Sequence, residues 1–128
     1  MSEPILSIDT SEIQESRLEE LTTKIKALVE FVEANEPRAI SYHVYLDDAH
    51  RRMTIAQLHP DSASLEYHME VAASAFSGFV DLVTLLSIDL YGAPSAKLLD
   101  QMRRKADLLG GARLAVHGSL AGFARLDR

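Results

Sequence analysis

Cysteine and tryptophan are both absent from this sequence of 128 residues. Without cysteine there is no disulfide framework, no thiolate metal site and no cysteine nucleophile, which fits a reducing compartment. No stretch of about 18 apolar residues occurs, so we expect no membrane-spanning helix and no membrane partner. The amino-terminal segment has no basic region followed by a long apolar run, so a secretory signal peptide is not expected. We therefore expect a cytoplasmic protein.

Basic residues are scarce as well. Lys and Arg number 13 against 19 Asp and Glu, which gives a net charge of −6. Because nucleic-acid binding requires a basic face, nucleic acid is not an expected partner. The sequence also lacks a Gly-rich phosphate loop, a G-x-S-x-G motif and an H-E-x-x-H motif, which removes the usual support for nucleotide binding, serine hydrolysis and zincin chemistry.

Residues 40–67 organise the rest of the chain. Apolar and polar side chains alternate over residues 39–46 and again over residues 53–58, a pattern typical of two strands joined by a polar turn. Pro60 ends the second strand because it has no N–H to donate and disfavours helical geometry at the residue before it. Asp61 is a good helix N-cap. The stretch predicts a β-hairpin that leads into a helix.

The same signals predict the elements on either side of the hairpin. Apolar residues recur at steps of three and four after Leu18, which is typical of an amphipathic helix. Ser16 and Glu19 have the spacing of a capping box at its start. In chain order we expect a strand within residues 4–13, a helix over 16–35, the two hairpin strands, a helix over 63–82, a strand over 87–91, a helix from Ser95 to Leu109 stopped by Gly110 and Gly111, and a short strand over 114–117.

This order of elements is that of the split βαβ, or ferredoxin-like, α+β fold. We expect one domain over residues 1–128, with a core of residues 4–91, an antiparallel sheet and two main helices on one face. Residues 92–128 add an extra C-terminal helix and a tail. Both faces of the hairpin carry apolar side chains, such as Val44 and Leu58, whereas a face in water should be more polar. A homodimer that pairs these faces would explain this, and we favour it. The alternative is that the third helix or the tail covers the second face within one chain.

The residues YHVYLDDAHRRMTIAQLHPDSASLEYHMEV, at positions 42–71, resemble the central block of the antibiotic biosynthesis monooxygenase (ABM) superfamily. In that family a Tyr-x-Val-Tyr-like strand leads through an acidic turn to a second strand, a polar cap and a helix that carries a His. The matching positions here are Tyr42, Val44, Tyr45, Asp47, Asp48, Asp61, Ser62 and His68. The resemblance covers about residues 4–91. It implies a dimeric α/β barrel with a pocket between the sheet and the helices of each subunit.

The resemblance also implies a choice of activities. Some members of the family oxidise aromatic polyketides or quinols with O₂ and no metal or flavin, and others degrade haem. The haem-degrading branch uses a Trp on the second helix and an Asn on the first strand. Here Trp is absent and the only Asn, Asn35, ends the first helix, so we reject haem degradation. What remains is a cofactor-independent monooxygenase of a small aromatic or quinol-like molecule. A non-catalytic small-molecule-binding or stress-response dimer, or a purely structural interaction module, stays open.

His68 is the candidate catalytic base. It lies three residues after Leu65 and four before Ala72, on or beside the buried stripe of the second helix. An imidazole there could take a proton from a phenol or quinol. The alternative is a core histidine bonded to a backbone carbonyl. The candidate substrate-binding residues are His43, Tyr45, Tyr42 and Phe76. For the two tyrosines and Phe76, packing in the core or at an interface is the favoured explanation.

No metal site is expected. Matching the apolar positions of the two hairpin strands pairs Tyr42 with Gln57, which places His43 and His59 on opposite faces. A slip of one residue would bring both onto one face, but still about 13 Å apart along the strands. That separation is too large for one ion, because zinc–nitrogen bonds are about 2 Å long.

The third helix carries a short basic run, Arg103, Arg104 and Lys105. Asp100 lies four residues before Arg104, a spacing at which opposite charges meet on a helix. We expect the whole run to form a solvated face with salt bridges.

Overall fold

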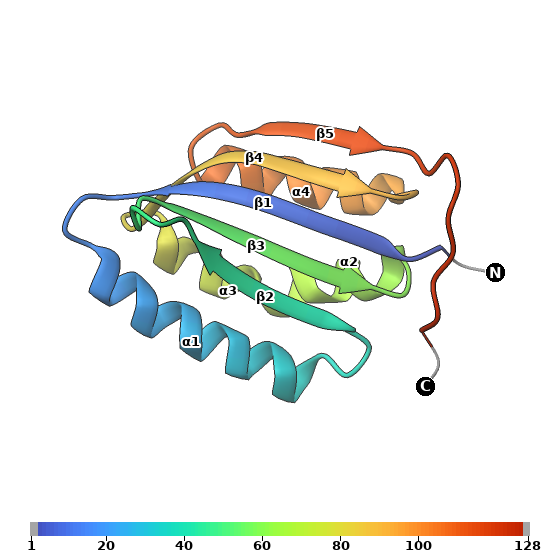
Figure 1. Cartoon of the computed structure of the whole chain (residues 1–128), viewed down its shortest axis with the longest axis horizontal. Coiled ribbons are helices and arrows are strands. Elements are labelled where there is room, and N and C mark those ends of the chain that lie inside the picture. The colour runs from blue at the N-terminus through green and yellow to red at the C-terminus, as the bar shows by residue number, and fades with distance from the viewer. Residues whose placement is uncertain (1–2, 127–128) are drawn as a thin grey trace.

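Five strands form one mixed sheet in the computed structural model, which describes residues 3–126 (Figure 1). Across the sheet their order is β2 (Ser41–Leu46), β3 (Arg52–His59), β1 (Ile5–Ile13), β4 (Val83–Tyr91) and β5 (Arg113–His117). The first four strands pair antiparallel, and β5 pairs parallel with β4. The ferredoxin-like α+β fold is therefore confirmed, with one parallel edge strand that the expected antiparallel sheet lacked.

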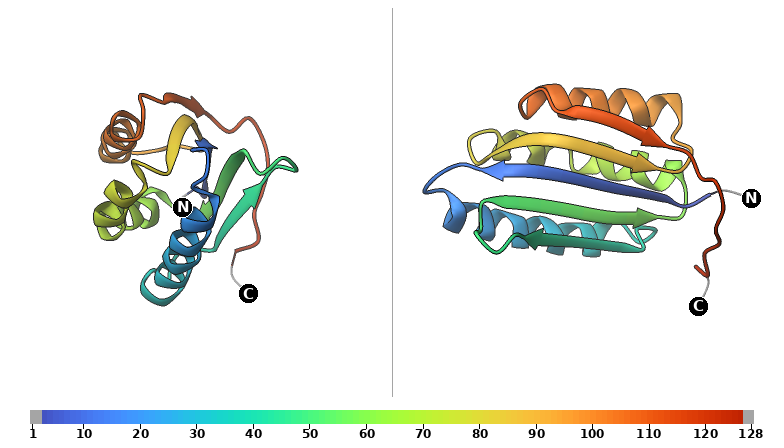
Figure 2. Two further views of the ribbon diagram at one scale, coloured as in Figure 1. Left: turned by 90° about the vertical axis from the view of Figure 1, so that its left-hand side faces the viewer. Right: turned by 45° about the horizontal axis from the view of Figure 1, so that its top comes forward.

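All the helices of residues 3–126 lie on one face of this sheet (Figure 2). They are α1 (Leu18–Asn35), α2 (Ser62–Val71), the short α3 (Ala73–Phe76), a 3₁₀ turn η1 (Ser77–Phe79) and α4 (Ala96–Leu108). Each long helix turns its apolar stripe to the sheet, as α1 does with Leu21, Ile25, Leu28 and Val32. Within the described part of the chain, no helix is both long and apolar enough to cross a membrane.

The register of the hairpin is the one that the apolar pattern predicts. Tyr42 pairs with Gln57, and Val44 pairs with Ile55. The alternation of strands then turns Tyr42 toward the helices and His43 away from them, and His59 is fully buried on the inner face. A correct register matters here, because a slip of one residue would exchange every inward and outward side chain.

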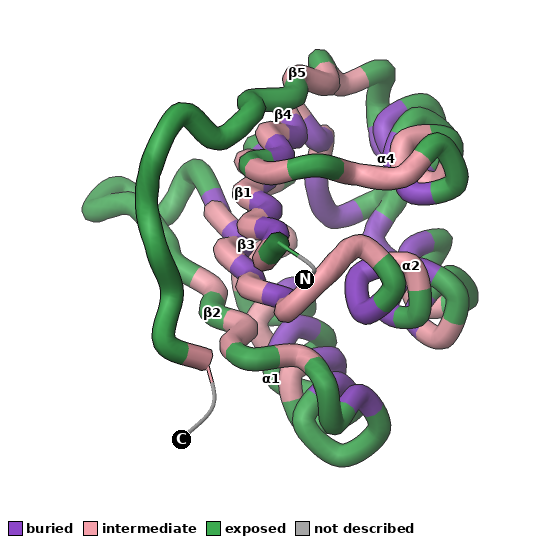
Figure 3. Tube along the Cα trace, turned by 90° about the vertical axis from the view of Figure 1, so that its right-hand side faces the viewer, coloured by how far each residue is buried: buried purple, intermediate pink, exposed green. Residues whose placement is uncertain are grey.

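The outer face of the sheet carries no helix from residues 3–126. Leu6 and Ile8 alternate with the buried inner residues of β1, so they point to this face, and both are only half-buried. The tail after β5 runs on this side of the molecule (Figure 3). Its apolar residues Leu120 and Phe123 are 100 % and 81 % exposed, so they do not pack on the sheet. Neither α4 nor the tail covers the outer face within one chain.

Two helix ends follow the predicted capping chemistry. The Asp61 carboxylate accepts a hydrogen bond from the backbone N–H of Ser64 at 2.9 Å, which begins α2. At the end of α4, the N–H of Gly111 donates to the carbonyl of Ala106 at 2.7 Å. Gly110 and Gly111 have φ values of 126° and 78°, in the left-handed region that glycine adopts without strain.

Three local predictions were wrong. Ser16 is not a capping residue: it has a φ of 68° and α1 starts after Arg17 without a side-chain cap. The helix expected over residues 63–82 ends at Val71 and continues only as α3 and η1. The break falls in a run of Ala, Ser and Gly, where few large side chains hold a regular helix against the core. Strand β4 starts at Val83 rather than Ser87, because Val83 and Leu85 are buried in the sheet.

Candidate functional site

The central strand β1 turns polar side chains toward the helices. Ser7, Asp9 and Ser11 are each no more than 2 % exposed. The apolar Leu6 and Ile8 point to the open face instead. Buried polar groups are stable only when they are paired, so this inverted pattern marks the space between the sheet and the helices as the candidate site.

Asp9 forms a buried ion pair with Lys105 of α4. The Lys105 Nζ lies 3.0 Å from Asp9 Oδ2, and the two side chains are 8 % and 3 % exposed. The same ammonium lies 4.9 Å from the centroid of the Phe76 ring, within the range of a cation–π contact. The prediction of a solvated basic face is therefore wrong for Lys105, which lies three residues after the buried Met102, although Arg104 does pair with Asp100 in solvent.

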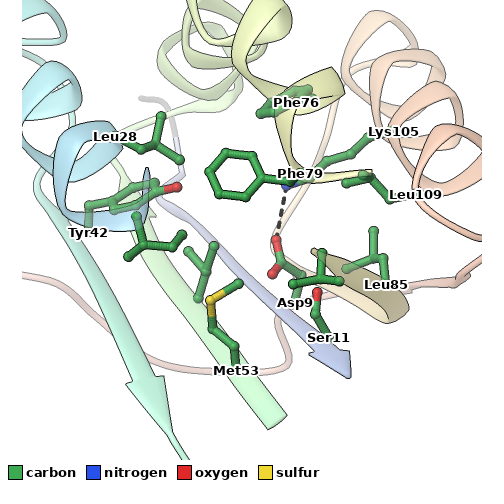
Figure 4. Close-up of a pocket in the computed structure, with 13 residues that line it drawn as sticks. Asp9, Ser11, Leu28, Tyr42, Met53, Phe76, Phe79, Leu85, Lys105 and Leu109 are labelled. Carbon is green, nitrogen blue, oxygen red and sulfur yellow. Dashed lines mark hydrogen bonds and ion pairs between the residues drawn. The ribbon is translucent and has the colours of Figure 1, made fainter. Parts of the chain in front are cut away.

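This ion pair lines a cavity between the sheet and the helices (Figure 4). Its volume is about 30 Å³. A buried water needs about 10–15 Å³ by this measure, so the cavity has room for one or two water-sized groups. The Tyr42 hydroxyl points into it. The polar side chains Asp9, Ser11, Tyr42 and Lys105 line it together with the rings of Phe76 and Phe79.

Glu36 and His68 form a second buried pair. Glu36 follows the last residue of α1, and His68 lies on α2. The Nδ1 atom of His68 is 2.8 Å and 2.9 Å from the two carboxylate oxygens of Glu36. An ionised carboxylate only accepts hydrogen bonds, so in the neutral imidazole this contact places the proton on Nδ1 and the lone pair on Nε2. The bonding partner is a carboxylate and not the backbone carbonyl of the alternative interpretation.

The Nε2 atom of His68 is buried and has no hydrogen-bond partner among residues 3–126. The His68 ring lies beside the rings of Tyr42, His59 and Phe76, at centroid distances of 5.5, 6.0 and 6.4 Å. Tyr42 and Phe76 also line the cavity. The unpartnered nitrogen therefore lies behind two aromatic side chains that border the cavity.

His59 is held between two neutral side chains. Its Nδ1 lies 2.7 Å from the Ser64 hydroxyl and its Nε2 lies 2.8 Å from the Gln57 amide oxygen. Burial, and to a smaller extent the neighbouring His68, lowers the pKa of His59 to about 4. His59 is thus neutral near pH 7, and it adds no charge beside His68.

Tyr42 remains a neutral hydroxyl. Burial is the largest cause that raises its pKa far above the ordinary value, and the charges of Asp9 and Glu36 raise it further. A phenol that does not ionise keeps its proton for donation to an acceptor.

A larger groove opens between α1 and β2. Its volume is about 520 Å³, and its polar lining includes His43, Lys26 and Glu30. Ile25, Tyr42 and Met53 border both the groove and the cavity. These three side chains separate the groove from the cavity.

The structure brings together some of the candidate residues and separates others. Tyr42 and Phe76 line the cavity, and His43 lines the groove. His68 lies behind them in the core. Tyr45 is 55 % exposed on the outer face, where its ring stacks on that of His43 at 6.0 Å, and it borders neither space.

Sequence reasoning missed three charged residues of the site. Asp9 could have been noticed in the sequence. It belongs to a strand in which polar residues alternate with apolar ones, and the polar set, rather than the apolar set, is the one that faces the core. Lys105 could also have been noticed, since it lies on the apolar stripe of α4. Glu36 could not, because it lies in the loop after α1 and meets His68 only in the folded chain. Among residues 3–126, no three His, Asp or Glu side chains gather as a metal site.

Neither a family model nor a curated protein matches this sequence. Solved structures do match the fold. MupZ from Pseudomonas fluorescens has a TM-score of 0.73 at 16 % identity, over 97 % of this chain and 96 % of that one. SnoaB, a cofactor-independent oxygenase from Streptomyces nogalater, has a TM-score of 0.62 at 9 % identity, over 74 % and 97 %. A protein of Deinococcus radiodurans classed with the antibiotic biosynthesis monooxygenases scores 0.61 at 18 % identity, over 72 % and 94 %.

These likenesses show the fold alone. The chain has the ferredoxin-like fold of the ABM structures, as its hairpin and second helix led us to expect. The match to MupZ takes in nearly the whole chain, so the segment after Gly92 has a counterpart in a known structure.

Proposed function

We propose that this chain, which has the fold of the ABM structures, is a cofactor-independent monooxygenase of a small aromatic or quinol-like molecule. The observation that carries the proposal is the Glu36–His68 pair, whose buried Nε2 has no partner among the described residues. A carboxylate on Nδ1 fixes the tautomer that leaves Nε2 basic. SnoaB, which shares the fold, is a cofactor-independent oxygenase.

In this proposal His68 acts as a general base. Nε2 accepts a proton from the ring system, and the imidazolium that forms is stabilised by the Glu36 carboxylate. The resulting ring anion is rich enough in electrons to reduce O₂ directly. For a ring methylene beside an aromatic carbonyl system, as in anthrone, both C–H bonds break and a C=O bond forms with one oxygen atom. The other oxygen atom leaves with two hydrogens as water, so atoms and electrons balance.

The ligand would enter by the groove between α1 and β2. The cavity, at about 30 Å³, is too small for an aromatic ring, whereas the groove of about 520 Å³ is large enough. A ring in the groove would contact Tyr42, with His43 of the edge strand β2 at its border. Rotation of the Tyr42 or Phe76 side chain would then open the path to His68.

We further propose that a second copy of the chain covers the outer face of the sheet. Leu6 and Ile8 of β1 point to this face, and no helix of residues 3–126 covers it. A two-fold pairing of identical faces would bury these residues in both subunits. The small-molecule site would then lie on the helix side of each subunit, away from the interface.

One observation favours a non-catalytic ligand-binding dimer instead. Tyr42 and Phe76 border the cavity while His68 lies behind them. If these rings never move, a bound ligand does not reach Nε2. A measurement of turnover separates the two functions, because binding alone consumes no oxygen.

The deciding experiment is oxygen uptake with anthrone and a panel of hydroquinones, in the presence of a metal chelator and without flavin. Turnover by the wild type that is lost in His68→Ala supports the proposal. His50→Ala is the matched control, because His50 is exposed in the hairpin turn, and it should behave as the wild type. Equal turnover in the wild type and His68→Ala would refute the role of His68. No turnover on any of these substrates would favour the ligand-binding dimer.

A further inference from the structure

We propose that the cavity bordered by Asp9, Lys105 and Tyr42 binds an uncharged hydroxyl group of the ligand. No residue of this ion pair takes part in the base chemistry assigned to His68. The aromatic part of the ligand is taken from the proposed function, whereas the hydroxyl group is argued from the cavity itself. It names the chemical group that the innermost part of the site recognises.

The size of the cavity limits what enters it. A volume of about 30 Å³ holds one or two water-sized groups. A hydroxyl group fits this space, and a ring does not. The rest of the ligand must therefore lie beyond Ile25, Tyr42 and Met53, in the groove that these three side chains share with the cavity.

The hydrogen-bonding groups on the wall match a hydroxyl group in particular. Lys105 has three N–H donors, of which one points to Asp9 Oδ2 at 3.0 Å. The Asp9 carboxylate accepts only, and the neutral Tyr42 hydroxyl can donate. A hydroxyl group both donates and accepts. It can thus donate to Asp9 while it accepts from Lys105 or Tyr42, which satisfies both members of the ion pair.

The charges around the cavity disfavour an ion. Asp9 and Lys105 compensate each other at 3.0 Å, so an added anion or cation has no unpaired opposite charge here. Asp9 and Glu36 together oppose the ionisation of Tyr42, whose pKa burial has already raised. A phenolate in the same cavity would lie beside the Asp9 carboxylate and would lose its contact with water in the same way. The bound form of the ligand is therefore the neutral hydroxyl.

A buried ion pair without a ligand is also an unusual element of a core. Such a pair costs more in lost hydration than well-packed apolar side chains of the same volume would. Phe76, which lies 4.9 Å from Lys105 Nζ, and Phe79 form the apolar remainder of the wall. We therefore infer that the ion pair serves to bind a ligand rather than to stabilise the fold.

The test compares two probes that differ only by a hydroxyl group in place of a methyl group, 4-nitrophenol and 4-nitrotoluene. Binding of each is measured by calorimetry below the pKa of the phenol. We expect the wild type to prefer 4-nitrophenol by at least about tenfold, because a site built for a hydroxyl group leaves polar groups unpaired when it is absent. The double variant Asp9→Asn with Lys105→Met should lose most of this preference and stay folded, since both charges are removed together.

Lys97→Met is the matched control, because Lys97 pairs with Glu70 on the exposed surface of α4 and α2, and it should keep the preference. A wild type that binds neither probe, or both equally, would overturn the proposal. Tighter binding of the phenolate than of the phenol, measured as the pH is raised, would overturn the claim that the group is uncharged.

The two proposals fail separately. His68→Ala should keep the preference for 4-nitrophenol, since His68 does not border the cavity. If the preference is found but no substrate consumes oxygen, the hydroxyl site stands and the oxidation falls. If oxygen uptake depends on His68 but the double variant binds both probes as the wild type does, the oxidation stands and the hydroxyl site falls.

Discussion

The Nδ1 atom of His68 lies 2.8 Å from Oε1 of Glu36, a residue 32 positions earlier in the chain. The contact joins the end of α1 to the last turn of α2, and both side chains are nearly inaccessible to solvent, at 0 % and 2 % exposure. A carboxylate in this position orients the imidazole and stabilises its protonated form. The pair therefore has the geometry that the proposed role of His68 as a general base requires.

Glu36→Gln should lower the turnover number at least about tenfold, with little change in KM, because a neutral amide no longer stabilises the imidazolium formed in proton transfer. Oxygen uptake at saturating substrate measures this effect. Glu70→Gln, on the exposed part of α2, should have the wild-type rate. Unchanged turnover in Glu36→Gln would show that the pair has only a structural role.

Lys105→Met should destabilise the protein by about 3–5 kcal/mol, because it leaves the Asp9 carboxylate buried without its partner. The combination of Lys105→Met with Asp9→Asn should recover most of this loss. Urea unfolding followed by circular dichroism measures both variants. If the double variant is as unstable as the single one, charge compensation is not what holds Lys105 in the core.

Lowering the pH should weaken the fold through His59. Its pKa is about 4 in the folded protein against an ordinary value of 6.5, so below pH 6.5 the unfolded chain binds a proton that the folded chain refuses. The free energy of unfolding contributed by His59 is full above pH 6.5 and falls progressively toward pH 4. The melting temperature of His59→Gln should depend less on pH in this window than that of the wild type, whereas His50→Gln should match the wild type. Parallel curves for the wild type and His59→Gln would contradict this.

Ile8→Arg should convert the proposed dimer to a monomer, because it places a charge at the centre of the outer sheet face. Light scattering coupled to size exclusion measures the mass of each species. Lys26→Ala, on the helix side of the molecule, is the control and should leave the mass unchanged. A wild type that runs as a monomer would show that the outer face has another cover or none.

The fold was largely predictable, because it depends on patterns within short segments. Alternation predicted the hairpin register between Tyr42 and Gln57, and the two glycines at 110 and 111 predicted the end of α4 just before them. The break in the helix after Val71 was not predictable in this way. The run of small residues there is compatible with a helix, whereas the folded chain continues only as α3 and η1, with Phe76 and Phe79 buried in the core.

The sequence by itself determined the order of the elements, the inward position of His68 and the opposite faces of His43 and His59, because each depends on the period of a single helix or strand. Only the tertiary structure decided that Glu36 meets His68 and that Asp9 meets Lys105. The members of these pairs are 32 and 96 positions apart. No local period relates residues so distant, and only the packing of helices on a sheet brings their charges together.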